Sequence, residues 1–170
     1  MQSENLKKTI YAAILGAGTV GTGVYKLCQQ MKDEFVQKTG ADLVVKKVLV
    51  RNASKKREGI EDAVLTDNWK EIIEDPEIDI VIEVMGGIEP AYTFVKRALE
   101  SGKSVCTSNK ALVAKHGAEL LEIAHEREIN FMFEASVGGG IPIIRPLNSS
   151  LTADVIVEIS GILNGTTNYM

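Results

Sequence analysis

The sequence of 170 residues has few cysteines, little net charge and no long apolar run. Its two cysteines, Cys28 and Cys106, lie far apart and show none of the close spacings of disulfide frameworks or structural zinc sites. No apolar run approaches the roughly 18 residues of a membrane span, and the polar start does not resemble a signal peptide. The net charge of −4 argues against a nucleic-acid-binding domain. These absences predict a cytoplasmic protein that binds neither membrane nor nucleic acid.

Short β-branched stretches alternate along the chain with longer stretches of helical spacing. Strands are expected at residues 10–15, 43–50, 78–85, 104–107 and 131–135, and helices at residues 20–35, 69–73, 90–100, 110–127 and 141–151. This alternation is typical of βαβ units. It predicts an α/β fold with a doubly wound parallel sheet of the Rossmann type.

The turn after the first expected strand matches the G-x-G-x-x-G pattern. It reads Gly16-Ala17-Gly18-Thr19-Val20-Gly21, and it leads into the first expected helix. In this context the first glycine allows a tight turn, the second lets a pyrophosphate approach the backbone, and the third lets helix and strand pack closely. We therefore predict a dinucleotide site with Gly16, Gly18, Thr19, Val20 and Gly21 around the phosphates.

The tip of the second expected strand carries a base where such sites usually carry an acid. An Asp or Glu there binds the ribose 2′-hydroxyl of NAD, but here Arg51 stands at the tip, and the basic residues 55–57 follow. A guanidinium suits phosphate geometry. This arrangement predicts that NADP(H) is preferred over NAD(H), and the alternative is a solvated basic loop.

Three further strand ends should meet at the same edge of the sheet, where ligands of parallel sheets bind. We expect Gly86 and Gly87, and then Thr107, Ser108 and Lys110, to contact the cofactor. At its strand-to-helix turn, Lys110 is placed to polarise an oxygen or exchange a proton, although an exposed lysine is the alternative. Trp69 is interpreted as a packing residue.

The third of these ends combines Glu134 with the glycines of residues 138–140. One carboxylate and the carbonyls of an irregular backbone offer the oxygen ligands of a hard cation. The residues alone favour the alternative, in which Glu134 caps a glycine-rich turn.

Five segments together resemble the homoserine dehydrogenase family. They are residues 16–23, 83–87, 108–110, 134–143 and 161–169, in the family's order and over nearly the whole chain. The resemblance implies reversible NAD(P)-dependent oxidation of L-homoserine to L-aspartate 4-semialdehyde, in threonine, methionine and isoleucine biosynthesis. Another dehydrogenase of an aspartate-derived substrate and a non-catalytic nucleotide-binding module are the alternatives.

The resemblance also implies roles for particular residues. Lys110 is the catalytic residue, at the junction of nicotinamide and substrate, and Gly165 and Thr166 form the floor of the substrate pocket. The family's monovalent cation site, usually for Na⁺, matches Glu134, Val137, Gly139 and Ile141.

We expect two parts in the chain. Residues 1–147 are assigned to the NAD(P)-binding domain, and residues 148–170 to the start of an α+β substrate and dimerisation domain, whose first strand is expected at residues 154–163. By the family pattern, a catalytic acid and a second lysine would lie beyond Met170. We therefore expect these 170 residues to bind cofactor without completing catalysis, and a longer chain to form a homodimer or tetramer.

Overall fold

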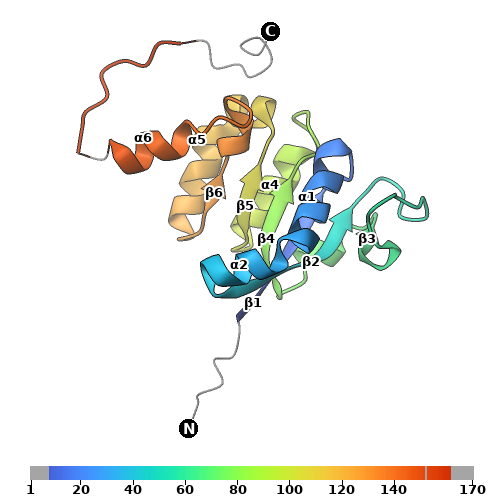
Figure 1. Cartoon of the computed structure of the whole chain (residues 1–170). Coiled ribbons are helices and arrows are strands. Elements are labelled where there is room, and N and C mark those ends of the chain that lie inside the picture. Colours follow the sequence, from blue (N-terminus) through green and yellow to red (C-terminus); the bar gives the residue numbers. More distant parts are fainter. Residues whose placement is uncertain (1–7, 152, 162–170) are drawn as a thin grey trace.

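The computed structural model describes residues 8–151 and 153–161, and a six-stranded parallel sheet forms its centre (Figure 1). The strand order is β3-β2-β1-β4-β5-β6. This order, with β1 in the interior and a reversal between β1 and β4, is that of a dinucleotide-binding fold. The strands are β1 (Lys8–Leu15), β2 (Ala41–Leu49), β3 (Leu65–Thr66), β4 (Ile78–Glu83), β5 (Ser104–Thr107) and β6 (Phe131–Met132).

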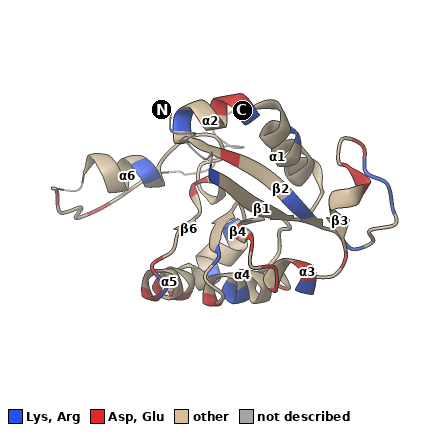
Figure 2. Cartoon of the chain, turned by 90° about the horizontal axis from the view of Figure 1, so that it is seen from below, with Lys and Arg blue, Asp and Glu red and all other residues tan. Residues whose placement is uncertain are grey.

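Helices cover both faces of this sheet, which confirms the predicted doubly wound arrangement (Figure 2). One face carries α1 (Thr19–Gln30) and α2 (Lys32–Thr39), and the other carries α3 (Lys70–Ile73), α4 (Ala91–Glu100) and α5 (Lys110–Glu126). The strands are apolar on both sides because both sides are buried. Two hydrophobic clusters result, with Ile14 on the α1 side and Leu15 on the α4 and α5 side.

The helix expected over residues 20–35 is wrong as a single element. α1 ends at Gln30, the backbone of Met31 leaves the helical conformation (φ −101°, ψ 23°), and α2 continues to Thr39. Asp33 and Glu34 lie in the first turn of α2. Acidic side chains stabilise a helix N-terminus, which favours a new helix at this point over continuation of the old one.

The strand expected over residues 131–135 is shorter than predicted. β6 contains only Phe131 and Met132, and a 3₁₀ turn over Glu134–Ser136 follows it. β6 pairs with β5 alone, at the edge of the sheet. The opposite edge strand, β3, was not expected from the sequence, and it follows a 3₁₀ turn over Asp62–Val64.

The strand expected over residues 154–163 does not form in the described part of that range. Residues 153–161 contain neither helix nor strand, and the exposed fractions of Val155 and Val157 are 89% and 94%. A strand requires a neighbour for its backbone hydrogen bonds, and none of the described residues provides one here. The last helix, α6 (Ile144–Ser150), spans the expected domain boundary at residue 147, so that boundary stays a prediction.

Candidate cofactor-binding site

The glycine turn lies between the end of β1 and the start of α1, as predicted. Gly16 has a φ of +105°, and its N–H donates to the Leu49 carbonyl at 3.0 Å. A side chain at Gly16 would place a Cβ 3.2 Å from both the Met85 Cγ and the Val84 carbonyl oxygen. Conformation and crowding therefore both require glycine at this position.

The N-terminus of α1 faces open space above the turn. A Cβ added at Gly18 would meet no atom of the described residues within 4 Å. Within that described part, no side chain caps α1, and its first turn holds no acid. Thr19 and Val20 are exposed beside it. Free N–H groups and the helix dipole make this end of α1 a suitable place for an anion.

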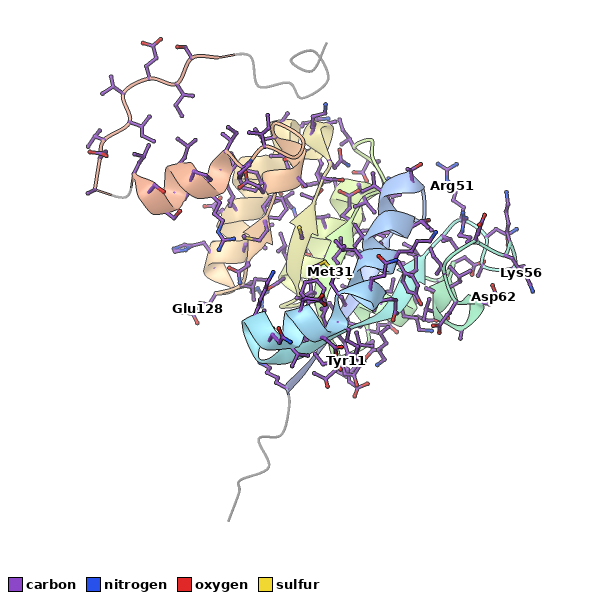
Figure 3. The ribbon with its side chains drawn as sticks, in the orientation of Figure 1. Tyr11, Met31, Arg51, Lys56, Asp62 and Glu128 are labelled. Atoms are coloured by element: carbon purple, nitrogen blue, oxygen red, sulfur yellow. The ribbon has the colours of Figure 1, made fainter. Side chains whose placement is uncertain are left out.

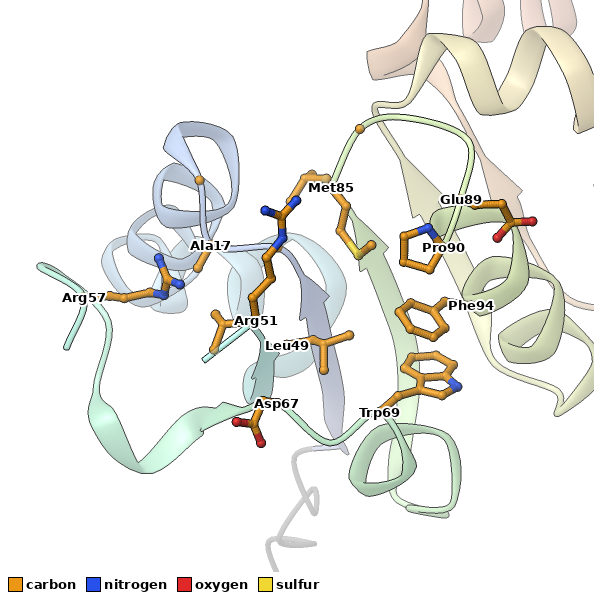
Figure 4. Close-up of a pocket in the computed structure, with 15 residues that line it drawn as sticks. Ala17, Leu49, Arg51, Arg57, Asp67, Trp69, Met85, Glu89, Pro90 and Phe94 are labelled. Atoms are coloured by element: carbon orange, nitrogen blue, oxygen red, sulfur yellow. The ribbon is translucent and has the colours of Figure 1, made fainter. Parts of the chain in front are cut away.

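A cavity of about 500 Å³ opens next to this helix end, above the carboxyl ends of β1, β2 and β4 (Figure 4). It is the crevice in which a doubly wound sheet binds its ligand. Its lining consists of Gly16, Ala17, Gly18, Leu49, Val50, Arg51, Arg57, Asp67, Trp69, Val84, Met85, Gly86, Glu89, Pro90 and Phe94.

Two guanidinium groups line the cavity near Ala17 (Figure 4). Arg51 comes from the tip of β2, as predicted, and Arg57 comes from the loop that follows. The Arg57 Nε is buried and has no hydrogen-bond partner among the described residues. Lys56, from the same loop, lies away from the cavity and approaches Asp62 at 3.8 Å (Figure 3). Arg51 and Arg57 are therefore the two basic residues of positions 51–57 that line the cavity.

The remaining wall of the cavity was not anticipated from the sequence. Trp69 and Phe94 stack with their ring centroids 4.5 Å apart, and both line the cavity. Trp69 also packs against the hydrophobic core, so its interpretation as a packing residue describes only part of its position. Asp67 follows the unpredicted strand β3 and accepts a hydrogen bond from the Ala53 N–H at 3.4 Å. Because β3 was not predicted, the sequence did not indicate that Asp67 and Trp69 lie at the edge of the sheet where ligands bind.

The ends of β4 and β5 come together on the other side of the crevice. Gly86 and Gly87 have φ values of +77° and +73°, and Gly86 lines the cavity. The Ser108 N–H donates to the Glu83 carbonyl at 3.2 Å. Lys110 is exposed at the first turn of α5. The sequence prediction that these residues share one edge of the sheet is therefore confirmed.

Thr107 and Asn109 turn inward at this edge. Thr107 is buried, and its hydroxyl donates to the Glu83 Oε2 at 2.5 Å. Asn109 caps α5, since its side-chain oxygen accepts from the Leu112 N–H at 3.2 Å. The Thr107 hydroxyl thus donates its hydrogen bond to Glu83 inside the protein and not toward the cavity. Sequence reasoning did not single out Glu83 or Asn109.

The Glu134 carboxylate caps the N-terminus of α6, whereas the alternative from the sequence had it capping the glycine-rich turn. Its Oε1 accepts from the Ile143 N–H at 2.5 Å and the Ile144 N–H at 3.0 Å, and its Oε2 accepts from the Arg145 N–H at 2.7 Å. These bonds, with the one from Ile143 largest, hold the pKa of the Glu134 carboxyl below its ordinary value.

The expected cation site therefore has backbone carbonyls as its available ligands. Gly138 and Gly139 adopt φ values of +69° and +65°, and Gly139 and Ile141 are exposed while Val137 is half-buried. In the described part of the chain, no three His, Cys, Asp or Glu side chains gather as metal ligands. Gly165 and Thr166, the expected floor of the substrate pocket, lie outside the described residues.

Two family models match successive parts of the chain. The model described as "Homoserine dehydrogenase, NAD binding domain" matches residues 16–134, which include the glycine turn, the cavity and Lys110. The chain belongs to the homoserine dehydrogenase family. A second model, described as "Homoserine dehydrogenase", matches residues 142–170.

Individual relatives agree with the family assignment. The homoserine dehydrogenases of Bacillus subtilis and Corynebacterium glutamicum are each 46% identical to the chain, over 96% and 93% of its length. The chain spans 38% and 36% of the lengths of these two relatives. A crystal structure of a homoserine dehydrogenase from Thiobacillus denitrificans superposes with a TM-score of 0.81 at 41% identity, covering 86% of this chain and 34% of that one.

A more distant neighbour bears on the cofactor. The structure of a hyperthermophilic archaeal homoserine dehydrogenase in complex with NADPH has a TM-score of 0.65 and 28% identity, covering 82% of this chain and 48% of that one.

None of the helices in the described residues is long and apolar enough to span a membrane.

Proposed function

We propose that the chain forms the NADP(H)-binding part of a homoserine dehydrogenase. The observation that carries this proposal is one continuous cavity that joins the open N-terminus of α1 to two guanidinium groups. The tip of β2 carries Arg51 where an NAD site would carry an acid. A family member has been solved with NADPH, which supports the choice of cofactor.

The cofactor would lie across the carboxyl edge of the sheet. Its pyrophosphate would accept hydrogen bonds from the backbone N–H groups at Gly18 and Thr19, and Val20 would flank it. Arg51 would hold the 2′-phosphate, with a bidentate geometry that a lysine does not offer. The nicotinamide half would extend toward Gly86, Gly87, Ser108 and Lys110.

For the reaction, we propose reversible oxidation of L-homoserine to L-aspartate 4-semialdehyde, within threonine, methionine and isoleucine biosynthesis. The bound nicotinamide supplies or accepts the hydride. The exposed ammonium of Lys110, at the first turn of α5, would polarise the substrate oxygen at the reacting carbon or exchange its proton. Gly165 and Thr166 would contact the small-molecule substrate, and the whole protein would be a homodimer or tetramer.

A monovalent cation, Na⁺, is proposed for the loop after β6. The consecutive left-handed glycines Gly138 and Gly139 turn successive peptide groups in different directions, which leaves carbonyl oxygens available to a hard cation. Glu134, Val137, Gly139 and Ile141 would supply backbone oxygens. The Glu134 carboxylate would shape the loop, because it already accepts three backbone N–H groups.

Titration with NADPH and with NADH at one ionic strength tests the cofactor assignment. The single tryptophan, Trp69, lines the cavity and gives a fluorescence signal for binding alongside calorimetry. We expect NADPH to bind at least tenfold more tightly, a difference of about 1.4 kcal/mol. Equal affinities would contradict the role of Arg51, and binding of neither dinucleotide would contradict the cofactor site itself.

A further inference from the structure

Glu83 is a fully buried carboxylate at the centre of the sheet. It is the last residue of β4, its exposed fraction is 0%, and β4 lies between β1 and β5. A buried carboxylate is costly unless its oxygens are well hydrogen-bonded. No Lys or Arg of the described residues pairs with Glu83, so neutral donors carry that compensation.

Four donors converge on this one side chain. The Oε1 accepts from the Met85 N–H at 2.7 Å, the Gly86 N–H at 3.3 Å and the Asn109 Nδ2 at 3.5 Å. The Oε2 accepts from the Thr107 hydroxyl at 2.5 Å. Two donors belong to the loop after β4, and the other two are Thr107, the last residue of β5, and Asn109, just before α5. The carboxylate therefore joins the two loops that flank the crevice on its nicotinamide side.

Asn109 extends this junction to the start of α5. Its Nδ2 donates to the Gly87 carbonyl at 2.5 Å, while its Oδ1 caps the helix at the Leu112 N–H. Its own N–H donates to the Thr107 hydroxyl oxygen at 3.0 Å. Lys110 follows directly in the chain. The Asn109 side chain thus links the Gly87 backbone to the start of α5, where the backbone of Lys110 lies.

We infer that Glu83 is a positioning residue that holds both loops in the arrangement that receives the nicotinamide half of the cofactor. This inference rests on the proposed function. The adenosine half, beside Arg51, lies at a different part of the cavity and does not depend on the Glu83 contacts. Loss of the carboxylate therefore weakens binding of the whole dinucleotide and leaves binding of its adenosine half unchanged.

Glu83→Gln is the most specific test of the carboxylate, because glutamine has nearly the same size and shape as glutamate. A carboxylate accepts hydrogen bonds at both oxygens, whereas a carboxamide has one acceptor oxygen and an NH₂ group that only donates. In Glu83→Gln, the amide oxygen can still serve the two loop N–H groups if its NH₂ turns toward Thr107, but the Thr107 hydroxyl must then accept instead of donate. In either orientation the negative charge that strengthens these hydrogen bonds is lost.

The test compares NADPH with adenosine 2′,5′-bisphosphate, which represents the adenosine half with its 2′-phosphate. For Glu83→Gln we expect the affinity for NADPH to fall about tenfold, as for loss of one charge-assisted hydrogen-bond contact, while the bisphosphate binds as in the wild type. A merely structural role would weaken both ligands equally, and that result would overturn the inference. Unchanged NADPH affinity, or a wild type that binds both ligands equally, would overturn it as well.

Two further variants complete the experiment. Asp79→Asn changes an exposed acid at the opposite end of β4, where it accepts from the Tyr11 N–H, and should leave both affinities unchanged. Thr107→Val removes one donor to Glu83 at nearly constant volume. It should weaken NADPH binding and leave bisphosphate binding unchanged, so it tests the role of Glu83 even if Glu83→Gln does not fold. If the wild type binds neither ligand, the proposed function is wrong. If the wild type binds NADPH but the variants show no selective loss of NADPH affinity, only the inference about Glu83 is wrong.

Discussion

A Cβ atom at Gly21 would lie 1.9 Å from the backbone carbonyl oxygen of Gly16. The third glycine of the turn thus packs the first turn of α1 directly onto the end of β1. The obstacle is backbone, which cannot rotate away as a flexible side chain would. Close packing at this point brings the N-terminus of α1 over the sheet edge, where it faces the cavity.

We predict that Gly21→Ala destabilises the chain by about 3 kcal/mol, at the upper end of the usual cost of overpacking. For a chain of this size, that loss corresponds to a fall in melting temperature of about 6–12 °C. Thermal unfolding followed by circular dichroism measures it. NADPH affinity should fall as well, because a displaced α1 no longer presents its N–H groups to the phosphates.

Gly23→Ala is the matched control on the same helix. A Cβ at Gly23 meets no described atom within 4 Å, so alanine fits without strain. Replacing glycine by alanine inside a helix stabilises it by about 0.5–1 kcal/mol. The two variants should therefore change the melting temperature in opposite directions, and equal losses in both would contradict the packing argument.

The parts of the site that were predictable from the sequence are those encoded locally. The glycine turn, Arg51 and Lys110 each follow a strand that alternation reveals, so their meeting at one edge was foreseeable. Asp67 and Trp69 were not foreseen, because β3 has only two residues and owes its existence to pairing with β2. The strand expected over residues 154–163 likewise needs a pairing partner, whereas the break at Met31 has a local signal in the acidic residues Asp33 and Glu34 of the first turn of α2.

Arg51→Ala should remove the preference for NADPH over NADH. The 2′-phosphate loses a charge-assisted contact, while NADH has no phosphate at that position. We expect the NADPH affinity to fall about 10- to 100-fold and the NADH affinity to change little, as measured by titration. Lys56→Ala is the control, because Lys56 belongs to the same basic loop but pairs loosely with Asp62 away from the cavity. If Arg51→Ala still prefers NADPH over NADH, residues other than Arg51 bind the 2′-phosphate.

The Glu134 cap predicts a pH-dependent change at α6. The pKa of Glu134 is lower in the folded chain than its ordinary value of 4.5, because three backbone N–H groups stabilise the carboxylate. Its contribution to stability is therefore present above pH 4.5, and it is lost as the pH falls through the folded-state pKa. The amide NMR signals of Ile144 and Arg145 should shift with a midpoint below 4.5. Glu134→Gln should abolish that titration, and a midpoint at or above the ordinary value would contradict the cap.

Lys103 gives a prediction at the opposite end of the sheet, far from the cofactor. Its exposed fraction is 6%, and its Nζ donates to the Asp75 carbonyl at 2.6 Å and the Ile78 carbonyl at 2.9 Å. Burial lowers the pKa of its ammonium, and the negative charge of Asp75 opposes that shift. The side chain thus ties the residue before β5 to the loop before β4 and to the first residue of β4.

Lys103→Met keeps the apolar stem of the side chain and removes only the donor. It leaves the two carbonyls without this donor, a loss that typically costs about 1–3 kcal/mol. Urea unfolding should show this loss as a lower midpoint with an unchanged slope, since the surface exposed on unfolding is the same. Lys115→Met, at an exposed position of α5, should stay within about 0.5 kcal/mol of the wild type. NADPH affinity should be unchanged in both variants, because neither lysine approaches the cavity, and a selective loss of binding in Lys103→Met would show that the two ends of the sheet are coupled.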